Sequence, residues 1–161
     1  MKQEATAEKC SPKQIAIRLA VAKAEAVSKK NPGAFVIGAD QILECHGQLF
    51  DKPKNLEEAL AHLNIFQGTW HQLISAVTLT HDGNTLWTHA ETATLKMRAL
   101  EAEDLERYIK ISGQEVLETV GAYRLEGIGA TLFEKIDGDY FTILGLPLLP
   151  LLACLREYKV I

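Results

Sequence analysis

The stretch that decides the fold covers residues 35–43 and reads Phe35-Val36-Ile37-Gly38-Ala39-Asp40-Gln41-Ile42-Leu43. Apolar, β-prone residues on both sides predict a buried strand, which a glycine, an alanine and an acid interrupt once. Asp40 is therefore expected at the end of a rigid strand or at a bend in it. Open α/β sheets carry their chemistry at such positions, so Asp40 is the first candidate site residue.

A basic cluster follows this strand on a predicted turn, where Lys52 and Lys54 flank Pro53. An acid held on a strand with lysines close behind it suits a phosphate-handling site. The acid would serve a metal or a water molecule, and the lysines would serve anionic oxygens. A turn carboxylate near a surface lysine would give the same pattern, so the residues alone leave both interpretations open.

The composition is that of an ordinary globular protein. The chain has 161 residues, of which 47% are hydrophobic and 24% charged, and this predicts one domain with a sizeable core. The net charge of −4 argues against a non-specific nucleic-acid binder, although a few lysines suffice for a small phosphorylated ligand. The three cysteines are scattered and odd in number, which favours a reducing, cytoplasmic setting over a disulfide framework or a zinc site. The most apolar stretch, residues 143–155, is too short to span a bilayer, so no membrane partner is expected.

Helix and strand signals alternate along the chain. A capping box at Ser11 predicts a helix from residue 12 to about residue 29, and a cap at Asn55 predicts a helix that ends at Gly68. The clearest hairpin covers residues 70–97, and a shorter one turns at residues 46–47. Further signals predict a helix at 101–111, strands at 130–136 and 140–144, and a last helix that ends near residue 158. This order predicts a mixed α/β fold whose partly antiparallel sheet is flanked by helices.

Six short motifs occur in one order along the chain. They are Gly38-Ala39-Asp40-Gln41, Lys52-Pro53, Gly68 with His71, Gly121-Ala122-Tyr123 with Glu126-Gly127, Gly138-Asp139-Tyr140 and Gly145-Leu146-Pro147-Leu148. Their spacing resembles that of the Maf family of nucleoside triphosphate pyrophosphatases, the septum-formation-inhibitor-like proteins. The resemblance covers essentially the whole chain.

The resemblance implies hydrolysis of a nucleoside triphosphate to the monophosphate and pyrophosphate with a divalent cation, Mg²⁺ or Mn²⁺. It also implies a single Maf/ITPase-like domain, residues 1–161, with a cleft and often a homodimeric state. By motif matching, Asp40 takes the position of the proton acceptor and candidate metal ligand. Lys23 and Lys52 take the phosphate-facing positions. Without the resemblance, Lys23 would be interpreted as a surface lysine whose stem covers apolar residues.

Two further positions bear on the nucleotide base. The chain has Gln41 and Glu126 where the resemblance places the residues that determine substrate specificity, and this pair is similar to the branch associated with 7-methyl-GTP. A carboxylate can accept from the adjacent N1–H and N2–H₂ donors of guanine, whereas uracil and thymine offer one N–H between two carbonyls. For Glu126, a solvated loop acid is the alternative.

The chain departs from the family at its start. Family members begin with a strand and a Ser-x-Arg-Arg type motif, and this sequence has no Arg-Arg pair. The chain is thus N-terminally truncated relative to the family. Three explanations compete: a misassigned start, a truncation, or a naturally shortened paralogue. Because arginines grip polyphosphates through charged hydrogen bonds, we expect weak or no activity from this chain. The alternative function is a catalytically impaired nucleotide-binding or division-linked regulatory paralogue.

Overall fold

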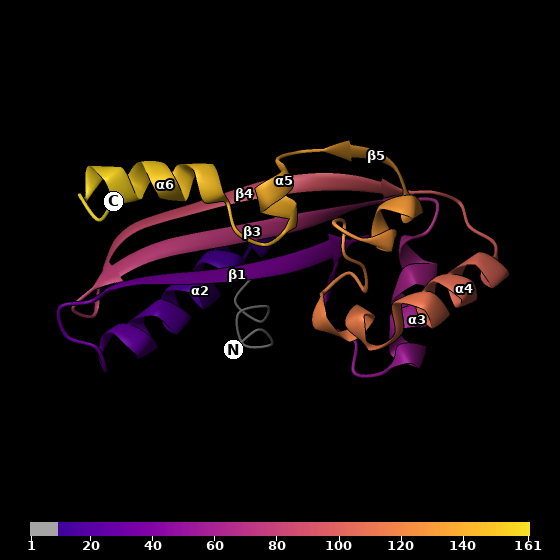
Figure 1. Cartoon of the computed structure of the whole chain (residues 1–161), viewed down its shortest axis with the longest axis horizontal. Coiled ribbons are helices and arrows are strands. Elements are labelled where there is room, and N and C mark those ends of the chain that lie inside the picture. Colours follow the sequence, from indigo (N-terminus) through magenta and orange to yellow (C-terminus); the bar gives the residue numbers. More distant parts are fainter. Residues whose placement is uncertain (1–9) are drawn as a thin grey trace. The chain divides into compact units, whose positions relative to one another are not determined.

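The computed structural model describes residues 10–161 and contains a five-stranded antiparallel sheet in the order β2-β1-β3-β4-β5 (Figure 1). The strands are β1 (Phe35–Cys45), β2 (Gln48–Phe50), β3 (Trp70–His81), β4 (Asn84–Met97) and β5 (Phe133–Asp137). The α-helices in this range are α2 (Pro12–Ser28), α3 (Leu56–Phe66), α4 (Ala102–Ser112), α5 (Tyr140–Ile143) and α6 (Leu148–Glu157), with 3-10 helices η1 (Gly113–Glu118) and η2 (Ile128–Leu132). The predicted mixed α/β fold is confirmed. None of the helices described is both long and apolar enough to cross a membrane.

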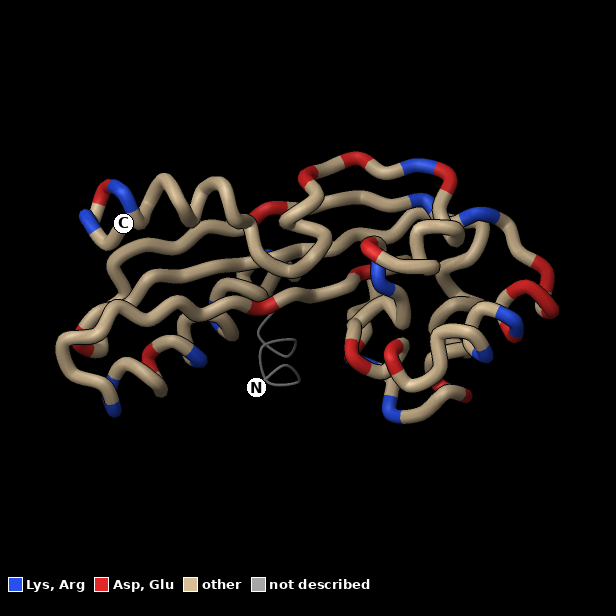
Figure 2. The backbone as a smooth tube through the Cα atoms, in the orientation of Figure 1, with Lys and Arg blue, Asp and Glu red and all other residues tan. Residues whose placement is uncertain are grey.

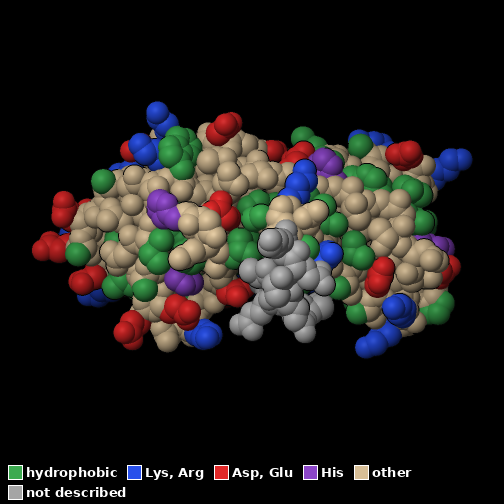
Figure 3. Space-filling view, turned by 180° about the vertical axis from the view of Figure 1, so that it is seen from behind, with side chains coloured by type: hydrophobic (Ala, Val, Ile, Leu, Met, Phe, Trp, Pro, Cys, Tyr) green, Lys and Arg blue, Asp and Glu red, His purple; other side chains and the backbone are tan. Residues whose placement is uncertain are grey.

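The chain forms two compact units. The first contains the residues up to Gln41 together with Ile74–Thr92 and Asp139–Ile161, and the second contains Ile42–Leu73 and Ala93–Gly138. Strands β1, β3 and β4 contribute residues to both units. Charged residues are sparse along the central strands (Figure 2), and β3 has no Asp, Glu, Lys or Arg at all. Acidic and basic side chains are interspersed on the face drawn in Figure 3, in keeping with the small net charge.

Helix α2 of the first unit begins at the predicted capping box. The Ser11 hydroxyl accepts from the Gln14 backbone N–H at 3.3 Å, and the Gln14 side chain accepts from the Ser11 backbone N–H at 2.9 Å. Pro12 occupies the first helical position, where no N–H is needed. The buried residues of α2 include Ile15, Ala16, Leu19, Ala20 and Ala24. Because several of them are small, the helix backbone can lie close to the sheet.

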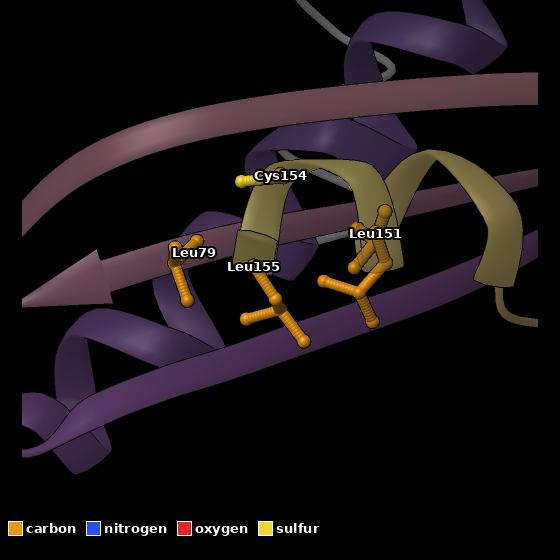
Figure 4. Packing of buried hydrophobic residues seen from close by; sticks show 5 residues of the cluster. Leu79, Leu151, Cys154 and Leu155 are labelled. Carbon is orange, nitrogen blue, oxygen red and sulfur yellow. The ribbon is translucent and has the colours of Figure 1, made fainter. Parts of the chain in front are cut away.

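Helix α6 of the first unit packs on strand β3 through an apolar cluster (Figure 4). The cluster consists of Val77, Leu79, Leu151, Cys154 and Leu155. Val77 and Leu79 are two residues apart and therefore project from the same face of β3, as does Ser75. Figure 4 shows α6 in front of the strands and α2 behind them, so each face of the sheet in this unit has its own helix.

The second unit contains the short hairpin predicted after the Asp40 strand. Residues His46 and Gly47 turn the chain with φ of 54° and 78°, and β2 then pairs antiparallel with β1. Helix α3 begins at the predicted Asn55 cap, and helix α4 ends at Gly113, whose φ of 57° suits glycine. These elements are confirmed as predicted.

Of the predicted strands, the one at 140–144 is wrong and the one at 130–136 is wrong in part. Residues 140–144 form helix α5 and the turn after it, because the Asp139 side chain accepts from the Thr142 backbone N–H at 2.8 Å and so caps a helix start. Gly145, with a φ of 105°, then turns the chain. The strand predicted at 130–136 begins only at Phe133, since η2 occupies the preceding residues.

Candidate active site

Gly38 brings strand β1 and helix α2 of the first unit into close contact. A Cβ atom at Gly38 would lie 2.4 Å from the Ala20 carbonyl oxygen and 2.7 Å from the Ala24 Cβ. Only glycine fits at this distance, and the small side chains on α2 complete the fit. This close contact explains the glycine in the decisive stretch, because it fixes the helix against the strand immediately before Asp40.

Asp40 projects from the same face of β1 as Gly38, two residues along the strand, and meets α2 there. Its Oδ1 accepts from the Lys23 ammonium at 2.6 Å, and the same ammonium donates to the Ala39 carbonyl at 3.2 Å. The Asp40 side chain is only 9% exposed, whereas that of Lys23 is 57% exposed. An ammonium group has three N–H bonds, so these two contacts leave the third for an anionic ligand.

The second carboxylate oxygen of Asp40, Oδ2, differs from Oδ1 in its hydrogen bonding. Oδ2 is buried and has no hydrogen-bond partner among residues 10–161. A buried carboxylate oxygen without a partner is costly, and in native proteins such atoms mark a water molecule, an ion or a catalytic role. The position therefore suits a water molecule whose proton Asp40 accepts.

A divalent cation also fits this oxygen. Carboxylate oxygen is a hard ligand of the kind that Mg²⁺ and Mn²⁺ prefer. Within the described part of the chain, no three Asp, Glu, His or Cys side chains come together as a metal site. Asp40 would therefore supply one protein ligand, with phosphate oxygens and water as the others, which is a common arrangement for Mg²⁺.

Gln41 projects from the opposite face of β1, as the alternation of a strand requires. Its carboxamide nitrogen lies 2.9 Å from the Ser75 hydroxyl, 3.1 Å from the Thr142 carbonyl and 2.9 Å from the Ile143 carbonyl. Two adjacent residues that the sequence assigns to one site thus have separate surroundings. Asp40 faces α2, and Gln41 faces α5.

The other two predicted site residues belong to the second unit. Lys52 is exposed in the connection between β2 and α3, next to the buried Pro53. Glu126 is exposed in the irregular stretch between η1 and η2. That stretch bends tightly around Arg124, because a Cβ at Gly129 would lie 2.4 Å from the Arg124 carbonyl oxygen. The Arg124 guanidinium is paired with Glu118, which leaves Glu126 as a separate acid.

The structure also shows a buried polar pair that sequence reasoning did not predict. The His71 Nε2 lies 2.6 Å from the Tyr123 hydroxyl, and the His71 Nδ1 is buried with no partner among the described residues. Burial lowers the pKa of His71 to about 4 and raises that of Tyr123 well above its usual value. Both residues stood in the motif list, but only the fold brings them together.

Cys45, at the end of β1, has the surroundings of a structural cysteine. It is buried, its thiol donates to the Trp70 carbonyl at 3.6 Å, and burial raises its pKa. A raised pKa disfavours the thiolate, which is the nucleophilic form of a cysteine.

Comparison with known protein families shows to which family this chain is related. The sequence matches the Maf family, described as "Maf-like protein", over residues 1–158. The chain belongs to the Maf family. The resemblance predicted from six motifs is confirmed, and those motifs lie within the matched residues.

Curated relatives of this Maf-family chain carry informative names. A "7-methyl-GTP pyrophosphatase" of Brucella suis is 54% identical over 151 residues, which cover 94% of this chain and 76% of that protein. A "Nucleoside triphosphate pyrophosphatase" of Granulibacter bethesdensis is 46% identical over 159 residues, covering 99% of this chain and 81% of that protein. A "7-methyl-GTP pyrophosphatase" of Bartonella henselae is 48% identical over 158 residues, with 98% and 80% covered.

Proposed function

We propose that this chain is a nucleoside triphosphate pyrophosphatase that hydrolyses a nucleotide such as 7-methyl-GTP to the monophosphate and pyrophosphate. The observation that carries the proposal is the Oδ2 of Asp40, which has no partner among residues 10–161 and is held on a rigid strand beside the Lys23 ammonium. The names of the similar proteins from Brucella suis and Granulibacter bethesdensis support the same reaction.

The reaction needs an oriented water, a proton acceptor and charge neutralisation on the leaving group. The water oxygen attacks the α-phosphorus, and the bond from that phosphorus to the oxygen bridging the β-phosphorus breaks. The bridging oxygen leaves with the pyrophosphate, while Asp40 Oδ2 accepts the proton that the water gives up. The strand fixes the acceptor before substrate arrives, so little reorganisation is needed during the reaction.

The cations take up the negative charge of the phosphates. Lys23 retains one N–H that can donate to a phosphate oxygen beside Asp40. We propose the exposed Lys52 as the second phosphate-binding residue. The alternative role of Asp40 Oδ2 is that of a ligand to Mg²⁺ or Mn²⁺, and the ion would then supply further charge neutralisation.

Base selection is proposed to depend on Glu126. Its exposed carboxylate can accept from the adjacent N1–H and N2–H₂ donors of a guanine, which favours a 7-methylguanine base over uracil. Gln41 is our second residue for base selection, and protein oxygens around its carboxamide nitrogen fix the orientation of the side chain.

The direct test is pyrophosphate release from 7-methyl-GTP with Mg²⁺, using the Brucella suis relative as the positive control. We expect this chain to release pyrophosphate under conditions in which the relative turns over. Nucleotide binding without any release, under conditions in which the relative turns over, would replace the proposal with the nucleotide-binding paralogue.

A further inference from the structure

We propose that the buried hydrogen bond between His71 and Tyr123 positions the Glu126 carboxylate, so that two interior residues help to set the preference for the base. The inference rests on the proposed function, in which Glu126 accepts hydrogen bonds from the base, and it deepens that function. The three residues all belong to the second unit. His71 is 1% exposed and Tyr123 is 5% exposed, so they act through Glu126 and are positioning residues.

Glu126 lies in a tight turn that follows Tyr123 directly. The Gly127 backbone N–H donates to the Arg124 carbonyl at 3.3 Å, which closes a four-residue turn with Glu126 in its third position. This hydrogen bond fixes the shape of the turn but not its place on the protein. The place depends on the residues at the base of the turn, and Tyr123 is the residue that leads into it.

The Tyr123 side chain ties the base of this turn to the sheet. Its hydroxyl lies 2.6 Å from Nε2 of His71, the second residue of strand β3. Burial lowers the pKa of His71 to about 4 and raises that of Tyr123 well above its usual value, so both groups are uncharged at neutral pH. Without the hydroxyl, the buried Nε2 would lose its partner, which is costly. The hydrogen bond therefore holds Tyr123 to β3.

The backbone around Tyr123 is held as well. The Thr119 hydroxyl accepts from the Tyr123 N–H at 3.1 Å and donates to the Tyr123 carbonyl at 2.9 Å. The Tyr108 hydroxyl donates to the Ala122 carbonyl at 3.1 Å. Ala122 has a φ of 56°, which a non-glycine residue keeps only where its surroundings hold it there. The hydroxyls of Tyr108 and Thr119 thus support a strained backbone immediately before the turn.

The place of the Tyr123 ring also explains the glycine that begins the Gly121-Ala122-Tyr123 motif. A Cβ at Gly121 would lie 2.3 Å from Cε1 of the Tyr123 ring, so the ring lies directly against the backbone there. Only glycine leaves room for the ring in the position that brings its hydroxyl to His71. The motif is therefore built around the same contact.

A fixed turn matters more for guanine than for uracil. Guanine offers two adjacent donors, and a carboxylate accepts from both only when its two oxygens are aligned with them. Uracil offers a single N–H, which makes a smaller demand on the orientation of the acceptor. A carboxylate that is held in place before binding also loses less freedom when the base arrives. Loosening the turn should therefore weaken recognition of a 7-methylguanine base and leave that of uracil nearly unaffected.

The kinetic experiment compares Tyr123→Phe and Tyr108→Phe with wild type on 7-methyl-GTP and UTP. Each variant removes one hydroxyl and keeps the ring. We expect kcat/KM for 7-methyl-GTP to fall about fivefold, chiefly through a higher KM, with kcat and the values for UTP changed by less than about twofold. Tyr158→Phe is the matched control, because its hydroxyl also donates to a backbone carbonyl, that of Leu86, but lies in the first unit.

A double variant separates positioning of Glu126 from a general structural role. Glu126→Gln should itself lower the preference for 7-methyl-GTP over UTP. In that background Tyr123→Phe should change the preference no further, because the carboxylate that it positions is already gone. An unchanged preference in Glu126→Gln would remove base selection by Glu126 and this inference with it, but not the hydrolysis.

The proposal is overturned if Glu126→Gln lowers the preference but Tyr123→Phe and Tyr108→Phe leave it unchanged. It is also overturned if Tyr123→Phe slows both nucleotides by the same factor, or lowers the preference equally in the Glu126→Gln background. Thermal melting establishes that each variant is folded, and Tyr108→Phe carries the test if Tyr123→Phe is not.

A second readout does not depend on turnover. Calorimetry with the product nucleotides 7-methyl-GMP and UMP should show a preference for 7-methyl-GMP that Tyr123→Phe lowers about fivefold. Hydrogen exchange at the amides of residues 121–127 should be at least about tenfold faster in Tyr123→Phe than in wild type and in Tyr158→Phe. If the wild type binds with this preference but releases no pyrophosphate, the proposed function fails and the positioning role stands. If it turns over but neither binding nor exchange changes in Tyr123→Phe, the function stands and the positioning role fails.

Discussion

The two faces of strand β1 in the first unit differ in how completely their polar groups are satisfied. On the α5 face, Gln41 and Ser75 have every donor paired with a protein oxygen. On the α2 face, Asp40 has one oxygen bound by Lys23 and one buried oxygen without a partner among the described residues. The two residues are neighbours in sequence and share one strand, so the difference comes from what packs on each face.

The difference indicates where the phosphates of the nucleotide bind. A buried oxygen without a partner carries a desolvation cost, and a bound water molecule, ion or ligand that donates to it or coordinates it offsets that cost. On the α5 face, the hydrogen bonds of Gln41 and Ser75 make the strand rigid. On the α2 face, this rigid strand holds the Asp40 carboxylate in place. The predictions below break or sharpen this contrast.

The largest effect is expected from Asp40→Asn. The amide keeps the size of the side chain but loses the proton acceptor, so kcat should fall about 1,000-fold, within the usual range for a general base. Nucleotide binding, measured by calorimetry, should change by less than about threefold. Asp137→Asn, on the exposed strand β5, is the control. A variant that retains more than a tenth of wild-type turnover would show that Asp40 is not the acceptor.

Gly38→Val tests the contact that creates the α2 face. The added Cβ would lie 2.4 Å from the Ala20 carbonyl oxygen, so helix and strand must separate. Because the collision involves backbone, we expect a loss of roughly 3 kcal/mol in the free energy of unfolding, the upper end for overpacking. Urea denaturation measures this loss. Gly127→Ala is the matched control, since its nearest contact would be an ordinary 3.9 Å. Equal stability of the two variants would refute the close approach.

His71 of the second unit offers a further comparison. Its Nδ1 is also buried and has no partner within the described part of the chain, but its ring packs against those of Phe66, Tyr123 and Phe133. Its pKa is lowered from 6.5 to about 4, so the unfolded chain takes up a proton first as the pH falls. Stability should therefore be complete above pH 6.5 and fall by roughly 2 to 3 kcal/mol between pH 6.5 and pH 4. Urea denaturation across this range checks the slope, and His71→Gln should flatten it. A variant with the wild-type slope would assign the pH dependence to other groups.

The smallest of these effects is expected for Lys23→Met. Methionine keeps the apolar stem but removes the ammonium, so Asp40 Oδ1 loses its partner and a phosphate oxygen loses a cation. We expect kcat/KM to fall about tenfold. Lys23→Arg should recover part of this loss because it keeps the charge. Lys30→Met, an exposed lysine just after α2, serves as control. The phosphate-binding role is excluded if Lys23→Met and Lys30→Met have the same steady-state rates.

Much of the fold was predictable from local signals. The capping boxes at Ser11 and Asn55, the turn at residues 46–47 and the long hairpin all depend on residues near each other in the sequence, and all form as predicted. The segment 140–144 was predicted wrongly because its apolar, β-prone residues outweighed the Asp139 cap, which satisfies a helix start.

The site was predictable only in part. The sequence identified Asp40 and Lys23 separately, and the Gly38 contact that joins them depends on two alanines in a distant helix. Side chains alternate between the two faces of a strand, and this alone predicts that Asp40 and Gln41 lie on opposite faces. The motif nevertheless assigned both residues to one site. The partners of Gln41 and of His71 lie 34 to 102 residues away, so no local pattern could predict them.

The role of the α2 face is tested most directly by following side-chain NMR signals while an α,β-methylene nucleotide analogue and Mg²⁺ are added. This analogue resists cleavage between the α- and β-phosphates, so the bound state persists. The account predicts large shifts of the Asp40 carboxylate carbon and the Lys23 ammonium. Binding of the analogue without a shift at either group would contradict it, because the phosphates would then lie away from the α2 face.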